Sequence, residues 1–144
     1  MRVDSQAVRS QPAPATKLAA EVSGPMTVLL VEDDVDLRDA TTTLFHLQGW
    51  SVLPAADGLT AIQQVNRHYD AVVLDMLLPG ASGFQVIQAV RNRRGPQLPV
   101  IMVSGNGLQA HQDYAAILGI SCFLEKPVSM DNLLKVLRES IANK

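Results

Sequence analysis

The order of apolar and polar residues changes character at Met26. From there on, short apolar runs alternate with segments whose apolar residues recur every three or four positions. Such runs are typical of buried strands, and the wider spacing is typical of helices. The pattern predicts strands at Thr27–Val31, Ser51–Ala55, Ala71–Leu74, Val100–Val103 and Cys122–Leu124. It predicts helices at Val35–Gln48, Gly58–Arg67, Gly83–Arg93, Leu108–Leu118 and Met130–Ala142.

Three helices carry further signals. The last helix has apolar residues along one face, at Met130, Leu133, Leu134, Leu137 and Ile141. For the first helix the spacing predicts a buried face made of Leu37, Ala40, Thr41, Leu44 and Leu47. Ser82 and Gln85 have the spacing of a capping box, which predicts the start of the third helix.

Strict alternation of strands and helices predicts a parallel sheet covered by helices on both faces. The first, third and fourth strands are continuously apolar, as strands buried on both faces should be. The second strand contains Pro54, which cannot donate a ladder hydrogen bond and therefore belongs at an edge. These features favour an α/β, flavodoxin-like, doubly wound (βα)5 fold with a five-stranded parallel sheet in the order 2-1-3-4-5.

Residues 1–25 differ from the rest of the chain. They hold Ser, Gln, Pro and Gly with scattered charges, and their apolar residues lack helical or strand spacing. Such a segment cannot bury enough apolar surface to offset the entropy of ordering it. We therefore predict a disordered N-terminal tail at 1–25 and one folded domain at 26–144.

Composition narrows the function. The chain has 144 residues, 47% of them hydrophobic, with 12 Lys+Arg against 14 Asp+Glu and a single cysteine. The balanced charge makes direct nucleic-acid binding unexpected, and one cysteine excludes an internal disulfide. No apolar stretch long enough to cross a membrane and no secretory signal is recognisable. We expect a cytoplasmic protein without a membrane partner.

Polar residues follow four of the predicted strands. Glu32, Asp33 and Asp34 follow the first strand, Asp75 the third, Ser104 the fourth and Lys126 the fifth. In the predicted strand order these four strands are neighbours, so their carboxyl ends converge on one patch. Clustered carboxylates repel and call for a cation, and oxygen ligands alone favour Mg²⁺, with Mn²⁺ as an alternative. A cation, a hydroxyl and a lysine beside a carboxylate are the parts of a phosphoryl site.

Four motifs at these strand ends resemble those of response-regulator receiver domains of two-component signalling, over about residues 26–143. They are VLLVEDD (28–34), VVLDMLLPGASG (72–83), IMVSG (101–105) and FLEKP (123–127). The resemblance implies that Asp75 is the phosphoacceptor. It also implies a Mg²⁺ site formed by Asp33 and Asp75, by the backbone carbonyl of Leu77, and by Glu32 acting mostly through water.

The same resemblance implies a conformational switch. Ser104 would hydrogen-bond the phosphoryl group after switching, and Lys126 would ion-pair with it. Phe123 takes the aromatic switch position, although it has no hydroxyl for a tyrosine-type hydrogen bond. The peptide bond between Lys126 and Pro127 is expected to be cis, as in the family.

A receiver would take its phosphoryl group from the phosphohistidine of a sensor histidine kinase or phosphotransfer protein. Its output would pass through the face formed by the fourth helix, the fifth strand and the fifth helix, to a partner or an output domain or by phosphorylation-dependent homodimerisation. It would not be an enzyme with a separate substrate, since it catalyses only its own phosphorylation and dephosphorylation.

Two other functions compete. Asp34 and Asp36 mimic the Asp-x-Asp signature of haloacid-dehalogenase-like phosphatases, but Leu37 and Arg38 do not continue that pattern. A pseudo-receiver, which binds partners without being phosphorylated, is disfavoured by the intact set of acids, Ser104 and Lys126.

Overall fold

The computed structural model describes residues 26–76, 80–105, 119–120 and 122–142. Its strands are β1 (Thr27–Val31), β2 (Ser51–Ala55), β3 (Ala71–Asp75), β4 (Val100–Ser104) and β5 (Cys122–Glu125). Its helices are α2 (Val35–Leu47), α3 (Gly58–Gln64), α4 (Gly83–Arg94) and α6 (Met130–Ala142). The predicted tail at 1–25 and the predicted helix at Leu108–Leu118 lie outside the described residues.

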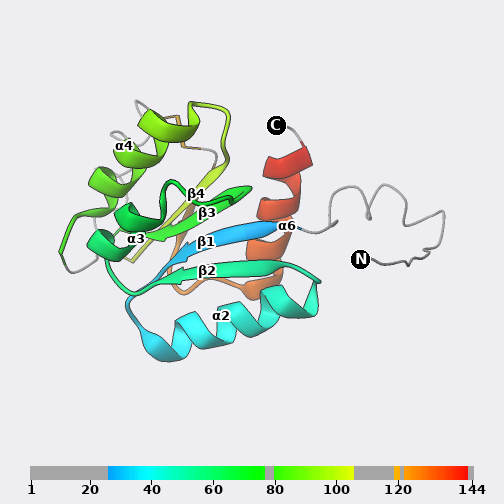
Figure 1. Cartoon of the computed structure of the whole chain (residues 1–144). Helices are drawn as coiled ribbons and strands as arrows, with labels where there is room; N and C mark the ends of the chain where they lie inside the picture. Colours follow the sequence, from blue (N-terminus) through cyan, green and yellow to red (C-terminus); the bar gives the residue numbers. More distant parts are fainter. Residues whose placement is uncertain (1–25, 77–79, 106–118, 121, 143–144) are drawn as a thin grey trace.

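The five strands form one parallel sheet in the order β2-β1-β3-β4-β5, which confirms the predicted fold (Figure 1). β3 and β4 are buried along their whole length, and β1 is buried except at Thr27. β2 lies at an edge of the sheet, where Pro54 is the register partner of Leu30. The missing amide hydrogen of Pro54 therefore breaks no ladder between two inner strands. The proline therefore marked the edge strand correctly.

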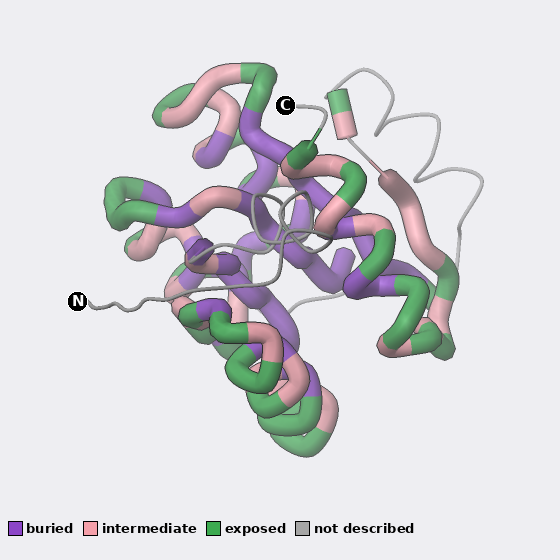
Figure 2. The backbone as a smooth tube through the Cα atoms, turned by 90° about the vertical axis from the view of Figure 1, so that its right-hand side faces the viewer, coloured by how far each residue is buried: buried purple, intermediate pink, exposed green. Residues whose placement is uncertain are grey.

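Two apolar layers hold the helices to the sheet. Successive side chains of a strand point to opposite faces of the sheet. Leu29, Val72 and Met102 lie on one face and pack under α3 and α4. Val28, Val73 and Ile101 face the opposite way and pack under α2 and α6. Figure 1 shows the two helix pairs on opposite sides of the sheet, and Figure 2 shows burial concentrated between them.

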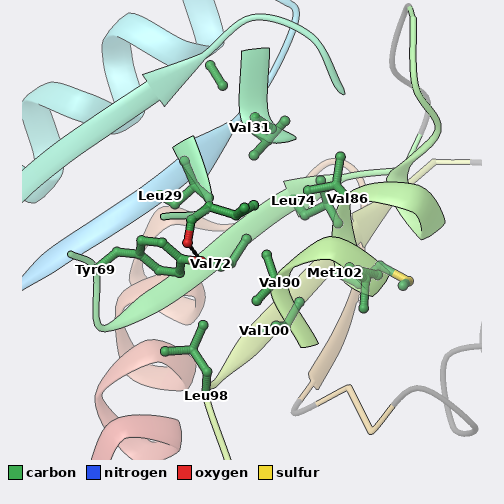
Figure 3. Packing of buried hydrophobic residues seen from close by; sticks show 14 of the residues in the cluster. Leu29, Val31, Tyr69, Val72, Leu74, Val86, Val90, Leu98, Val100 and Met102 are labelled. Atoms are coloured by element: carbon green, nitrogen blue, oxygen red, sulfur yellow. Dashed lines mark hydrogen bonds between the residues drawn. The ribbon is translucent and has the colours of Figure 1, made fainter. Parts of the chain in front are cut away.

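Tyr69 anchors the layer between the sheet and α4, and Figure 3 shows it among the aliphatic side chains of that layer. Its ring is fully buried, and its hydroxyl donates to the carbonyl oxygen of Val65 at 2.9 Å. The guanidinium of Arg94 lies 4.6 Å from the ring centroid. Burial raises the pKa of Tyr69, against the lowering effect of Arg94.

Several boundaries differ from the prediction by a few residues. β3, β4 and β5 each run one residue further, because Asp75 pairs with Val103 and Ser104 pairs with Glu125 in continuing ladders. α3 is shorter than predicted and ends at Gln64. The acceptor candidate Asp75 is therefore the last residue of its strand rather than the first of a loop.

The buried face of α2 was wrongly predicted in part. Thr41 and Phe45 are its buried residues, whereas Ala40 is exposed and Leu47 is 76% exposed. Phe45 turns inward because its ring packs on Trp50, with 5.4 Å between centroids. Two residues correspond to roughly 200° around a helix, so Leu47 must then face solvent.

No described helix has both the length and the apolar character needed to cross a membrane.

Candidate functional site

The carboxyl ends of four strands converge as predicted. Val31 pairs with Leu74, so the next residues, Glu32 and Asp75, lie side by side. Ser104 is the last residue of β4 and follows Val103, which pairs with Asp75. The carbonyl oxygen of Ser104 accepts a hydrogen bond from the Lys126 amide at 3.0 Å. Glu32, Asp75 and Ser104 are all buried. Burying ionisable groups costs free energy unless they are paired. Their collection at one end of the sheet therefore marks a candidate functional site.

Glu32, Asp33 and Asp75 form a carboxylate cluster. Each offers one carboxylate oxygen, and these atoms lie within 4.8 Å of one another. Asp33 is exposed, whereas the other two are buried. The donors are carboxylate oxygens only, which suits a hard divalent cation such as Mg²⁺ or Mn²⁺. The described residues thus fit the predicted metal site, while the predicted ligand Leu77 lies outside them.

Lys126 bridges the two buried acids. Its ammonium lies 2.8 Å from Oδ2 of Asp75 and 3.4 Å from Oε1 of Glu32. Burial alone would lower the pKa of Lys126, but the hydrogen bond and charge of Asp75, together with Glu32, raise it above its ordinary value. The side chain is therefore a cation at neutral pH. The following Lys126–Pro127 peptide is cis, as expected.

The β1–α2 turn fixes Glu32 from several sides. Its amide donates to the carbonyl of Ala55 at 3.0 Å, and its Oε2 accepts from the amide of Asp34 at 3.1 Å. Arg38, one turn into α2, donates from Nη1 to the Glu32 carbonyl oxygen at 2.8 Å. Burial raises the pKa of Glu32, and Asp75 adds to the rise, while the Asp34 amide and Lys126 oppose it.

Arg38 is a residue of this site that the sequence prediction missed. Its guanidinium holds the backbone of the turn that presents the acids, rather than an acid itself. The only available signal was an arginine within the first two turns of the helix that follows the acidic motif. A contact to a backbone carbonyl leaves no pattern in side-chain types, so sequence reasoning had little to detect.

Close packing at two glycines places Ala81 against the start of α3 and Met76 against the start of α4. A Cβ added to Gly58 at the start of α3 would lie 2.0 Å from the carbonyl oxygen of Ala81. A Cβ added to Gly83 would lie 2.6 Å from the sulfur of Met76. The predicted capping box is present, since the Gln85 amide donates to Ser82 and the Gln85 side chain accepts from the Ser82 amide.

The candidate switch residues occupy different environments. Ser104 is completely buried at the end of β4. Phe123 pairs with Met102 in the sheet and is partly buried against the layer under α3 and α4. The structure therefore brings Ser104 to the acidic site and directs Phe123 toward the neighbouring face of the sheet.

The phosphatase signature does not assemble. Asp34 caps α2, and its Oδ1 accepts from the amide of Leu37 at 3.1 Å. Asp36 is exposed in the first turn of α2 and is not part of the described carboxylate cluster. One aspartate of this pair caps a helix and the other faces solvent, so the two do not share a reaction centre. The structure therefore disfavours the phosphatase alternative.

A doubly wound α/β domain with acids, a buried serine and a lysine at its strand ends is the architecture of a phosphorylation-controlled signalling module. The model of the response regulator receiver domain family matches residues 28–138, so the chain belongs to this family. Receiver domains signal through phosphorylation, and this chain therefore contains a signalling domain of two-component systems.

The chain is similar to known regulators over part of their length. The transcriptional regulatory protein CpxR homolog of Haemophilus influenzae is 32% identical over 107 residues, which cover 74% of this chain and 46% of that protein. The chain spans about half the length of the curated relatives it matches.

Solved receiver domains share its fold. The receiver domain of the sensor histidine kinase PA1611 from Pseudomonas aeruginosa has a magnesium ion coordinated in its active site cleft. It is 27% identical, with a TM-score of 0.73, and the match covers 83% of this chain and 99% of that one. A CheY-like receiver domain from Methanospirillum hungatei, 23% identical, has a TM-score of 0.79 with 83% and 96% covered, and shows the shared fold alone.

Proposed function

We propose that Asp75 accepts a phosphoryl group from the phosphohistidine of a sensor histidine kinase or phosphotransfer protein. The observation that carries this proposal is the Lys126 ammonium, 2.8 Å from Asp75 and 3.4 Å from Glu32 at the convergent strand ends. In the transfer, the P–N bond to imidazole breaks and a P–O bond to an Asp75 carboxylate oxygen forms. The imidazole nitrogen keeps the bonding pair.

The cation required for transfer is Mg²⁺, with Mn²⁺ able to replace it. Asp33 and Asp75 would hold it directly and Glu32 through water, and the carbonyl of Leu77 is the fourth proposed protein contact. When bound, the ion neutralises negative charge on the transferring phosphoryl oxygens. The support within this chain is the carboxylate cluster, whose oxygens lie within 4.8 Å of one another.

Lys126 and Ser104 would then respond to the new phosphoryl group. Lys126 already faces Asp75 as a cation, so it can pair with a phosphoryl oxygen with little movement. Ser104 follows the strand residue opposite Asp75 and can offer its hydroxyl as a donor. Movement of Ser104 would shift β4, and Phe123 on the adjoining strand would follow, which biases a pre-existing two-state equilibrium.

The output would use the face formed by the segment at 108–118, β5 and α6. A downstream protein, an output domain or a second phosphorylated copy would bind there, and the chain would act in the cytoplasm without contacting nucleic acid directly. As a signalling domain it would turn over no separate substrate.

The test is phosphorylation by acetyl phosphate, measured by intact-protein mass with Mg²⁺ or with a chelator. Wild type should gain one phosphoryl group only with the metal, and Asp75→Asn should gain none. Asp36→Asn is the matched control, because Asp36 is an exposed acid outside the cluster. It should behave as wild type.

Two results would contradict the proposal. Phosphorylation of Asp75→Asn at the wild-type level would place the acceptor elsewhere. No phosphorylation of a folded, Mg²⁺-binding wild type by either acetyl phosphate or a phosphorylated kinase would favour the pseudo-receiver alternative.

A further inference from the structure

A cavity of about 430 Å³ opens beside the acidic site, between the strand ends, the first turns of α2 and the segment that leads into α6. This volume lies at the lower end of the range for small-molecule sites in proteins. The exposed residues Asp34 and Pro127 form part of its rim.

The two ends of the cavity have different chemistry. At one end the buried carboxylates of Glu32 and Asp75 face the ammonium of Lys126, and Asp34, whose Oδ1 caps α2, lines the cavity at its rim. The local charge is therefore negative even with Lys126 in place, and this end favours a second cation.

The other end is apolar and lies under α2 and α6. Leu37, Val128 and Leu133 supply aliphatic walls. Thr41 is buried there, and its hydroxyl contacts the sulfur of Met130 at 4.0 Å. Thioether sulfur is a weak acceptor, so this hydroxyl remains able to bond a better partner.

A metal ion accounts for only one end of this cavity. Mg²⁺ takes oxygen ligands and keeps several waters, and the aliphatic walls and the thioether offer it nothing. An occupant that matches both ends needs a positive group and an apolar body joined in one small molecule.

We propose that this cavity binds a small amphipathic amine, with its ammonium beside Glu32 and Asp75 and its apolar body between α2 and α6. Such a ligand takes the place of the metal at the acidic end. It therefore inhibits phosphorylation of Asp75, a consequence that rests on the proposed function, whereas the binding itself does not.

The binding test uses three probes against the metal-free protein: hexylamine, methylamine and 1-hexanol. Hexylamine carries both an ammonium and a long apolar chain, whereas methylamine keeps only the ammonium and 1-hexanol only the chain. Because burial of its methylene groups adds to the pairing of its ammonium, hexylamine should bind at least about tenfold more tightly than either fragment. Calorimetry gives the affinities, and the NMR signal of the Met130 methyl group gives the location. Equal affinities, or an unmoved Met130 signal, would overturn the proposal.

Cavity-filling variants separate this site from general binding to an acidic surface. Val128→Phe and Leu37→Phe both place a ring in the apolar end and should each weaken hexylamine binding about tenfold or more. Leu44→Phe is the matched control, since Leu44 is a partly buried leucine of the same helix that does not line the cavity. Undiminished binding in a folded cavity-filling variant would place the amine elsewhere.

The last test is competition between hexylamine and Mg²⁺. Added Mg²⁺ should raise the apparent dissociation constant of hexylamine, and hexylamine should raise the Mg²⁺ concentration needed for phosphorylation by acetyl phosphate. Binding that is indifferent to Mg²⁺ would refute the shared site. If hexylamine binds as described but no phosphorylation occurs at all, the proposed function fails while this inference stands.

Discussion

Replacing Lys126 by methionine isolates the charge balance of the strand-end site. Methionine keeps most of the aliphatic stem and removes the ammonium that contacts Asp75 at 2.8 Å and Glu32 at 3.4 Å. Both acids are buried, so neither can gain full hydration in exchange. We expect the metal-free protein to lose stability and to depend more strongly on Mg²⁺.

The distances give the magnitude. Two carboxylates with oxygens no more than 4.8 Å apart repel by about 3.5 kcal/mol at an effective dielectric constant near 20. In wild type Lys126 offsets this repulsion. Removing one partner from a buried ionic group typically costs about 3–5 kcal/mol, so we expect a loss of about 3 kcal/mol in the free energy of unfolding. Partial protonation of Glu32, whose pKa is already raised, reduces the loss at acidic pH.

The assay is urea unfolding in a chelator and again in saturating Mg²⁺. Lys126→Met should lose about 3 kcal/mol in the chelator and recover part of it with Mg²⁺, because the ion supplies the missing positive charge. Lys135→Met is the control, as Lys135 is exposed on α6. A metal-free loss no larger than in the control would show that Lys126 does not balance this site.

Three further predictions follow from the contacts described above. Arg38→Met should weaken Mg²⁺ binding by about tenfold, because the variant loses the guanidinium that holds the Glu32 carbonyl. Calorimetry compares its Mg²⁺ affinity with that of the control Arg67→Met, which changes an exposed arginine, and equal affinities would contradict the prediction. Tyr69→Phe should cost about 1 kcal/mol near neutral pH through the lost hydrogen bond to Val65. Because burial raises the folded pKa of Tyr69 above 10.0, its stabilisation is complete below that value and is lost as pH rises through the folded pKa. The gap between wild type and Tyr69→Phe should therefore narrow in unfolding experiments at alkaline pH, and a constant gap would refute the argument. Trp50 directly precedes β2, at the amino end of the sheet, and a five-residue strand spans about 17 Å. Its fluorescence should thus barely respond to Mg²⁺, and a large quench would be inconsistent with this placement.

The fold was predictable because buried parallel strands leave a strong signal. Continuous apolar runs marked β3 and β4 as inner strands, and Pro54 marked β2 as an edge. The buried face of α2 was less predictable, since Leu47 fits the helical spacing as well as Phe45 does. The choice between them depends on the tertiary contact with Trp50, which no local pattern contains.

The side chains gathered at the site were predictable for a related reason. Parallel strands end on the same side of a sheet, so Glu32, Asp75 and Lys126 could be brought together from their positions after the strands alone. The atoms that hold them could not. The Arg38 contact to a carbonyl and the approach of Gly58 to Ala81 involve backbone atoms, which every residue possesses.

The arrangement also explains why the site is built from the sheet rather than from one loop. Glu32, Asp75 and Lys126 repel or attract one another strongly, yet each follows or ends a different strand. The ladders from β1 to β5 fix the spacing of these residues. The apolar layers on both faces stabilise the sheet, and the sheet thereby holds the acids in positions that their mutual repulsion opposes. A local electrostatic cost of this kind persists where the surrounding structure over-determines it. A cation bound there would relieve this strain, and a phosphoryl group on Asp75 would alter it under the proposed function. The resulting difference in free energy would then bias the conformation of β4 and β5.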